Sequence, residues 1–190
     1  GGRDTVFANA YGAPFVYGLD GKRRPSMLED AHNFFKMGQM SQAMHVPGIL
    51  PVEPQDVPVP HRHLELMHAA LTLTDKPVKG SVLSETAARD CVEMARIVFG
   101  EEFADDNVVM AALLNCNTPL VWDETMLQSL RVYAAANQPC LLSPFVLAGA
   151  STPASPMGGV SLLIAESLAG MAYSQIIRRG APMVLGVAIM

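Results

Sequence analysis

Apolar and polar positions along the chain predict short buried strands that alternate with amphipathic helices. The apolar runs cover residues 46–52, 77–83, 108–114, 140–147 and 183–189. Between them, apolar residues recur at the spacing of a helix over residues 60–73, 84–99, 123–136 and 156–178. Nearly continuous apolar runs of this length are typical of parallel strands that are covered on both faces.

The first 27 residues follow a different pattern, which predicts a β-hairpin ahead of the regular part of the chain. Two apolar runs, 5–8 and 15–17, flank the turn-forming residues 12–14, and Asp20 followed by Gly21 adds a second turn. We expect this segment to decorate the domain rather than to form one of its own.

Polar residues at the predicted helix starts support these boundaries. Ser26 followed three positions later by Glu29 resembles a capping box and predicts a helix over about 28–44. Ser84 and Asp123 stand where an N-cap side chain accepts a hydrogen bond from a free backbone N–H. Each helix is therefore predicted to begin within a residue or two of these positions.

The spacing of the predicted strands indicates a barrel of β/α units. Strand starts at residues 46, 77, 108, 140 and 183 are separated by 31, 31, 32 and 43 residues, and repeated units of about 30 residues place parallel strands side by side. We predict an α/β fold: about five units of a TIM (β/α)8 barrel over residues 28–190, preceded by the hairpin of residues 1–27, in a single domain. Because eight units close such a barrel, the native protein is expected to be longer.

Composition narrows the classes of function. Half of the residues are apolar, and the net charge of −5 comes without a stripe of Lys and Arg, which argues against a nucleic-acid surface. Cys91, Cys116 and Cys140 form no Cys-x-x-Cys pair and are predicted to be reduced, buried thiols of a cytoplasmic protein. No secretory signal pattern opens the chain, and no membrane span is predicted, because polar residues interrupt the apolar run 157–173.

Candidate binding residues follow from the rule that parallel β/α folds bind ligands beyond the C-terminal ends of their strands. Asn115 and Asn117 follow the strand predicted at 108–114, at alternate positions whose side chains share a face. Glu53 is displayed between two prolines, and Phe145 and Trp122 are aromatic residues that could hold a quaternary ammonium group. The alternatives are that the amides cap a helix, that Glu53 is solvated and that Trp122 packs in the core. No catalytic residue is predicted.

A metal-binding pair is not predicted from His61 and His63. Both residues lie at the start of a predicted helix, where positions two apart point in different directions. We therefore expect no tightly bound metal, and a metal-dependent hydrolase on the same barrel is kept as an alternative function.

Several stretches together resemble the trimethylamine methyltransferase family of corrinoid-dependent enzymes. They read GILPVEP (48–54), LTLTDKP (71–77), EMARIVFG (93–100), NTPLVWDETML (117–127), SPF (143–145), AESLAG (165–170) and RGAP (179–182). The resemblance runs in order from about residue 11 to residue 186, and it implies a TIM barrel.

The resemblance also implies a reaction and its partners. A methyl group would pass from a tertiary or quaternary methylated amine, such as trimethylamine or glycine betaine, to a corrinoid (cobalamin) on a separate corrinoid protein. Members that use trimethylamine carry pyrrolysine, while many bacterial relatives lack it. This chain shows none, but it ends before the later strands where that residue would be expected. On this view Glu53, Asn115 and Asn117 orient the substrate, while Phe145 or Trp122 contacts its cationic end. Such an enzyme could form a homo-oligomer. A truncated, inactive barrel fragment is kept as a further alternative to an enzyme.

Overall fold

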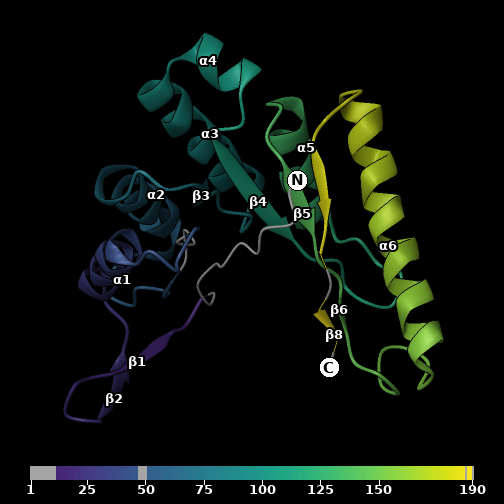
Figure 1. Ribbon diagram of the computed structural model, residues 1–190, viewed down its shortest axis with the longest axis horizontal. Helices are drawn as coiled ribbons and strands as arrows, with labels where there is room; N and C mark the ends of the chain where they lie inside the picture. The colour runs from purple at the N-terminus through teal and green to yellow at the C-terminus, as the bar shows by residue number, and fades with distance from the viewer. Residues whose placement is uncertain (1–11, 47–50, 187, 190) are drawn as a thin grey trace. The chain divides into compact units, whose positions relative to one another are not determined.

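The computed structural model describes residues 12–46, 51–186 and 188–189. The chain divides into two compact units, Gly1–Lys79 and Gly80–Met190 (Figure 1). The first unit contains a hairpin and two helices, and the second contains the parallel sheet with its own helices.

The first unit opens with the hairpin. Strand β1 (Phe15–Tyr17) pairs antiparallel with β2 (Arg23–Pro25), and the turn between them is closed by the Gly21 N–H, which donates to the Gly18 carbonyl at 2.9 Å. Gly21 has a φ of 75°, a conformation that glycine adopts without strain. A hairpin thus forms in the predicted region, with Arg23–Pro25 as the partner strand. The predicted run 5–8 lies outside the described residues.

The carboxylate of Asp30 hydrogen-bonds two groups at the start of helix α1 (Leu28–Met40). One Asp30 oxygen accepts the Met27 N–H at 2.8 Å, and the carboxylate receives two hydrogen bonds of 2.7 Å from the Arg24 guanidinium. The hydrogen bond from Arg24 holds the pKa of Asp30 below its ordinary value. This pair links the second strand of the hairpin to the start of the helix.

The predicted capping box of Ser26 and Glu29 is wrong. Ser26 is fully buried, and its hydroxyl donates to the Glu53 carbonyl at 2.6 Å, so it is not free to cap the helix. The N-cap position falls to Met27 instead. The helix also ends at Met40, four residues before the predicted end.

The rest of the first unit consists of the 3-10 turn η1 (Val59–His61), helix α2 (Arg62–Leu73) and strand β3 (Val78–Lys79). Helix α1 packs against α2, with Phe35 and Leu66 fully buried. Part of the strand predicted over 46–52 lies outside the described residues. At its end, Val52 makes a single parallel bridge with Ala13.

Lys76 closes the C-terminal end of α1. Its ammonium donates to three carbonyl oxygens, those of Gly38 at 2.6 Å, Ser41 at 2.7 Å and Met44 at 2.7 Å. The last carbonyls of a helix have no partner within the helix, and a cation placed there also matches the helix dipole. The segment after α2 therefore ties down the end of α1.

The second unit is built on parallel strands. Strands β4 (Met110–Leu114), β5 (Cys140–Leu142) and β7 (Met183–Leu185) lie in that order, with Cys140 opposite both Ala112 and Met183. A second parallel pair, β6 (Phe145–Val146) and β8 (Ala188–Ile189), continues the chain beyond β5 and β7. The predicted run 140–147 is thus divided into two strands, because Pro144 has no N–H to donate to a ladder.

The helices of the second unit match the sequence-based expectations closely. They are α3 (Glu85–Phe99), α5 (Glu124–Ala135) and α6 (Pro156–Ile177). The Ser84 hydroxyl accepts the Ala87 N–H at 3.0 Å, and the Asp123 carboxylate accepts the Met126 N–H at 2.8 Å, so both predicted N-caps are confirmed. The short helix α4 (Glu101–Asp106) is not predicted by the apolar pattern.

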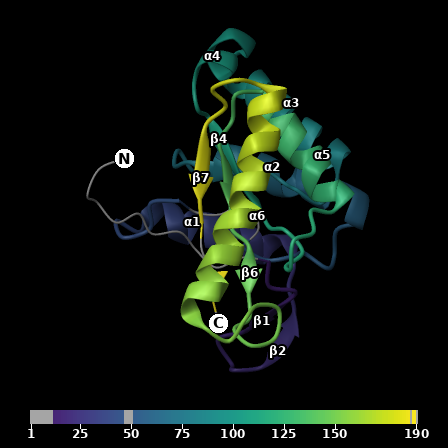
Figure 2. The same ribbon diagram turned by 90° about the vertical axis from the view of Figure 1, so that its right-hand side faces the viewer.

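The helices cover one face of the parallel strands. Helix α5 packs on β4 and β5, α6 packs on β5 and on α5, and Figure 2 shows α5 and α6 to one side of β4 and β7. In β4, residues 110, 112 and 114 are buried, whereas 111 and 113 are only half-buried. The α/β class with parallel strands is therefore confirmed, and the sheet of this unit is open along the described residues.

Helix α6 is long and apolar enough, by length and composition alone, to cross a membrane. This differs from the expectation that the run 157–173 falls short of a span. Its buried residues include Leu163, Glu166 and Gly170, which lie on one face at helical spacing. That face packs against the sheet of the second unit, as expected of a helix that covers a sheet.

A buried amide joins the start of β4 to the loops around it. The Gln138 side chain is 2% exposed, and its oxygen accepts the N–H groups of Val109 at 3.0 Å and Met110 at 3.2 Å. Its nitrogen lies within hydrogen-bond distance of three carbonyl oxygens, those of Ala104 at 2.8 Å, Asn107 at 3.0 Å and Ala136 at 3.2 Å. A side chain with both ends satisfied in this way stabilises the fold where an unpaired amide would destabilise it.

Replacing Gln138 by leucine should lower the free energy of unfolding by about 3 kcal/mol, because several buried backbone groups lose their partner. The measurement is chemical denaturation followed by circular dichroism. Gln128→Leu serves as the control, because the Gln128 amide contacts only the exposed Glu124 side chain, at 2.8 Å. Equal stability of the two variants would contradict the role given to Gln138.

Replacing Lys76 by methionine should lower the free energy of unfolding by about 2 kcal/mol, because three carbonyls at the end of α1 lose a charged donor. The same denaturation measurement applies, with Lys36→Met as the matched control. Lys36 is exposed on α1. A loss in the Lys76 variant no greater than in the control would show that the ammonium does not stabilise the helix end.

Candidate functional site

The candidate site lies where β4 ends and the loop to α5 begins. Beyond Leu114 the chain stays extended, and its side chains alternate: Cys116 is buried and Thr118 half-buried, whereas Asn115 and Asn117 are exposed. Successive side chains of an extended chain point to opposite faces. The two amides therefore point away from the face that the helices cover.

The loop folds back on itself directly after these residues. Asn117 and Val121 form an antiparallel bridge, with N···O distances of 2.7 and 3.2 Å. Within it the Thr118–Pro119 peptide bond is cis and Leu120 has a φ of 59°. This turn brings three hydrogen-bond donors, those of Cys116, Thr118 and Leu120, to the same side of the loop.

Those three donors meet the carboxylate of Glu166 on α6. One oxygen accepts the Thr118 hydroxyl at 2.9 Å and the Cys116 thiol at 3.1 Å, and the other accepts the Leu120 N–H at 2.6 Å. Glu166 is 1% exposed. A carboxylate can be buried this deeply only where hydrogen bonds replace those of water, and the loop provides them.

Burial and the Glu166 hydrogen bond also define the state of the Cys116 thiol. Together they raise the pKa of Cys116 to about 12, so the thiol stays protonated at neutral pH and acts as a donor, not a nucleophile. Burial raises the pKa of Cys140 to about 12 and that of Cys91 to about 11. All three cysteines are free and buried, as the sequence predicts.

Asn115 is the predicted site residue whose side chain contributes least to holding the fold together. It is exposed, and its amide makes no hydrogen bond among the described residues. The ladder of β4 and β5 continues one step beyond the strands, because the Ser143 N–H donates to the Leu114 carbonyl at 2.9 Å. That register places Ser143 beside Asn115. A polar pair thus lies at the end of the two strands.

Gly186 has no side chain, and its lack of a Cβ makes room for Ser143. Its N–H donates to the Leu142 carbonyl at 2.6 Å, which continues the ladder of β5 and β7 past Leu185. A Cβ at residue 186 would lie 2.9 Å from the Ser143 Cβ, too close for any larger residue. The row across the strand ends is therefore small and polar.

Asn117 has a structural partner as well as an exposed position. Its amide donates to one oxygen of Asp123 at 3.1 Å, and the other oxygen of Asp123 caps α5. Asn117 therefore binds the residue that caps α5 and does not cap the helix itself. Phe145, at the start of β6, is 42% exposed and lies in the same unit as both asparagines.

Trp122 packs on α6. Its indole N–H donates to the Glu166 backbone carbonyl at 3.1 Å. A Cβ at residue 170 would lie 2.6 Å from Cζ2 of Trp122 and 2.8 Å from Cδ1 of Leu142, so the ring lies directly against Gly170. The alternative that Trp122 packs in the core therefore fits this structure, because its ring packs against α6.

Glu53 belongs to the first unit. Its N–H donates to the Ala13 carbonyl at 3.0 Å, and its carbonyl accepts from Ser26 and from the Gln55 side chain, at 2.6 and 2.7 Å. The carboxylate is half-buried beside Gly12. The other four predicted residues share the second unit.

Glu166 is the site residue that sequence reasoning missed. In the sequence it is a polar residue that interrupts an apolar run. The signal was present, because a lone carboxylate in a helix that is apolar nearly all round needs buried partners. Which partners those are could not be read from the pattern.

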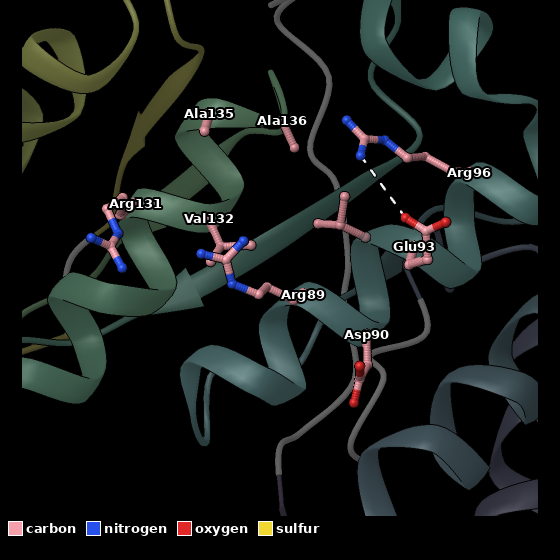
Figure 3. Close-up of a pocket in the computed structure, with 9 residues that line it drawn as sticks. Arg89, Asp90, Glu93, Arg96, Arg131, Val132, Ala135 and Ala136 are labelled. Atoms are coloured by element: carbon pink, nitrogen blue, oxygen red, sulfur yellow. Dashed lines mark ion pairs between the residues drawn. The ribbon is translucent and has the colours of Figure 1, made fainter.

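A groove of about 710 Å³ between α3 and α5 is a weaker candidate. Its charged residues are paired: Arg89 and Arg131 both bind Glu85, at 2.6 and 2.8 Å. Figure 3 shows Arg96 turned toward Glu93, 3.9 Å away. Such pairs are typical of a solvated helix surface.

A metal site does not emerge from the described parts of the chain. Within residues 12–46, 51–186 and 188–189, no group of three or more His, Cys, Asp or Glu side chains could hold a metal ion. His61 ends η1 and His63 lies in the first turn of α2.

Comparison with known proteins identifies the family. The chain is 42% identical over 187 residues to a glycine betaine methyltransferase of Desulfitobacterium hafniense (strain Y51), an alignment that covers 98% of this chain and 39% of the relative. The chain therefore spans about two fifths of the length of that relative. The trimethylamine methyltransferase (MTTB) family matches residues 1–189. On both counts, the chain belongs to the trimethylamine methyltransferase family.

Proposed function

We propose that the full-length protein is a methyltransferase that takes a methyl group from a methylated amine, with glycine betaine as the first substrate to test. The observation that carries this proposal is the match to the family over residues 1–189, together with the name of the 42% identical relative. The exposed polar row at the strand ends of the second unit supports it, because parallel β/α folds bind ligands there.

The fold of the whole domain is proposed to be a TIM barrel, to which residues 28–190 contribute as one domain. Support comes from the face of the sheet that no helix of the second unit covers. By register, Leu113, Leu141 and Val184 lie in one row on that face, and Val184 is 46% exposed. Rows of branched apolar side chains are typical of a barrel interior, which further strands would enclose.

Glycine betaine carries a carboxylate at one end and a trimethylammonium group at the other. The unpaired Asn115 amide can donate to the carboxylate, with the Ser143 hydroxyl beside it as a second donor. The exposed Phe145 ring can face the trimethylammonium group, since aromatic faces bind quaternary ammonium. Phe145 suits this role better than Trp122, because the Trp122 ring is packed against Gly170. Asn117 and Glu53 are kept as further substrate contacts.

The methyl acceptor is proposed to be a corrinoid carried by a separate protein, in the cytoplasm. A corrinoid would supply the electron pair for the new bond to the methyl group, and the amine nitrogen would keep the electron pair of the C–N bond. The work of this chain is then to bind and orient the amine and to keep water away from the reacting methyl group.

Replacing Asn115 by alanine should raise the KM for glycine betaine about tenfold, because one donor to the carboxylate is lost. The assay is methyl transfer from glycine betaine to cob(I)alamin by the full-length protein. Tetramethylammonium, which has no carboxylate, should inhibit the variant and the parent protein equally well.

Asn33→Ala on α1 is the matched control, because Asn33 is exposed and lies in the first unit. Its KM should stay at the parent value. An unchanged KM in the Asn115 variant would remove Asn115 from the site. Absence of methyl transfer from any methylated amine by the parent protein would overturn the proposed function itself.

A further inference from the structure

We propose that Glu166 is a positioning residue for substrate: its carboxylate fixes the loop between β4 and α5 so that Asn115 and Asn117 face the bound amine. The inference rests on the proposed function. Nothing in the substrate would touch Glu166, which is 1% exposed and lies on α6. It would act through the backbone of the loop.

The groups that Glu166 binds are regularly spaced along the loop. Its three partners are Cys116, Thr118 and Leu120, at 3.1, 2.9 and 2.6 Å, and they are alternate residues of one segment. The Cys116 and Thr118 side chains lie on one side because side chains alternate along the chain, and the turn at residues 118–120 brings the Leu120 N–H to the same carboxylate. One carboxylate therefore fixes the orientation of five consecutive residues.

The residues that alternate with these groups point to the other side of the loop. Asn115 and Asn117 are exposed, while Cys116 is buried and Thr118 half-buried. Anchoring Cys116 and Thr118 on the helix side forces the two amides to the other side. Release of the anchor would let the segment rotate, and the amides would no longer be held ready to bind the substrate, which weakens binding.

The same loop has a second point of attachment to α6. Gly170 stands four residues after Glu166 on α6, and the Trp122 ring lies against it. Positions four apart share a helix face. The Trp122 N–H also donates to the Glu166 carbonyl at 3.1 Å. The loop is thus attached to α6 at two neighbouring points: the Glu166 side chain binds Cys116 and Thr118 beside the amides, and the Trp122 ring lies against Gly170.

The test uses the full-length protein with Glu166→Ala, Glu166→Gln and Thr118→Val. We expect Glu166→Ala to raise the KM for glycine betaine about tenfold while kcat changes less than about threefold, because the loosened amides bind the substrate less tightly while substrate that is bound still reacts. Glu166→Gln should keep KM within about threefold of the parent, since its amide oxygen can still accept the Leu120 N–H. Thr118→Val should fall between the two.

Coupling to Asn115 separates positioning from general stability. If Glu166 acts through Asn115, then adding Asn115→Ala to Glu166→Ala should raise KM by less than about threefold more, a clear departure from additivity. A merely structural role would lower the active fraction, and with it kcat, and leave KM unchanged. That result would overturn the inference.

Alkylation of Cys116, followed by peptide mass spectrometry, reports on the loop without any activity. Iodoacetamide should label Cys116 faster in Glu166→Ala than in the parent protein, while Glu102→Ala on the exposed surface of α4 should match the parent. If Glu166→Ala does not fold, Thr118→Val gives the decision: parent-like KM and parent-like labelling would overturn the inference. A parent protein that transfers no methyl group but shows the labelling pattern would refute the proposed function and, with it, the substrate role of Glu166, while the loop anchor would stand.

Discussion

A buried carboxylate that forms no ion pair with the described residues has to find its hydrogen bonds nearby, and this requirement shapes the second unit. Glu166 lies on the covered face of α6, where it is 1% exposed. It obtains its donors from the loop after β4. The helix and the loop therefore depend on each other: the loop satisfies the buried charge, and the carboxylate gives the loop one orientation.

The other end of β4 is held by a second buried polar side chain. Gln138 binds the N–H groups of Val109 and Met110 at the start of the strand, as Glu166 binds Cys116 and Thr118 beyond its end. Apolar packing against α5 covers the strand between these two points. Apolar contacts bury the strand without directing its ends, whereas hydrogen bonds are directional and fix where each end points.

This arrangement separates the face that stabilises the unit from the face available to a ligand. The buried members of β4 pack under the helices, and the intervening residues lead to Asn115 at the strand end. For the proposed methyl transfer such a division has a clear use. The reaction needs an amine held still and kept dry more than it needs an acid or a base.

The sequence by itself determined the elements, because periodicity and capping are local properties. The strand at Met110–Leu114 and the N-caps at Ser84 and Asp123 follow from residues close in the chain. Family membership was also within its reach. Local patterns failed where a distant group competes for the same atom: Ser26 gives its hydroxyl to Glu53 and leaves the helix cap to Met27.

Only the tertiary structure decided which polar residues work together. Glu166 and Thr118 are 48 positions apart, so no window of sequence could pair them. The same holds for Trp122, whose ring turns to Gly170 and not to the open face, because the glycine leaves room for it on α6. Alternation along an extended segment told which residues share a side, but which side is buried and which is exposed depended on where a distant helix placed its buried carboxylate.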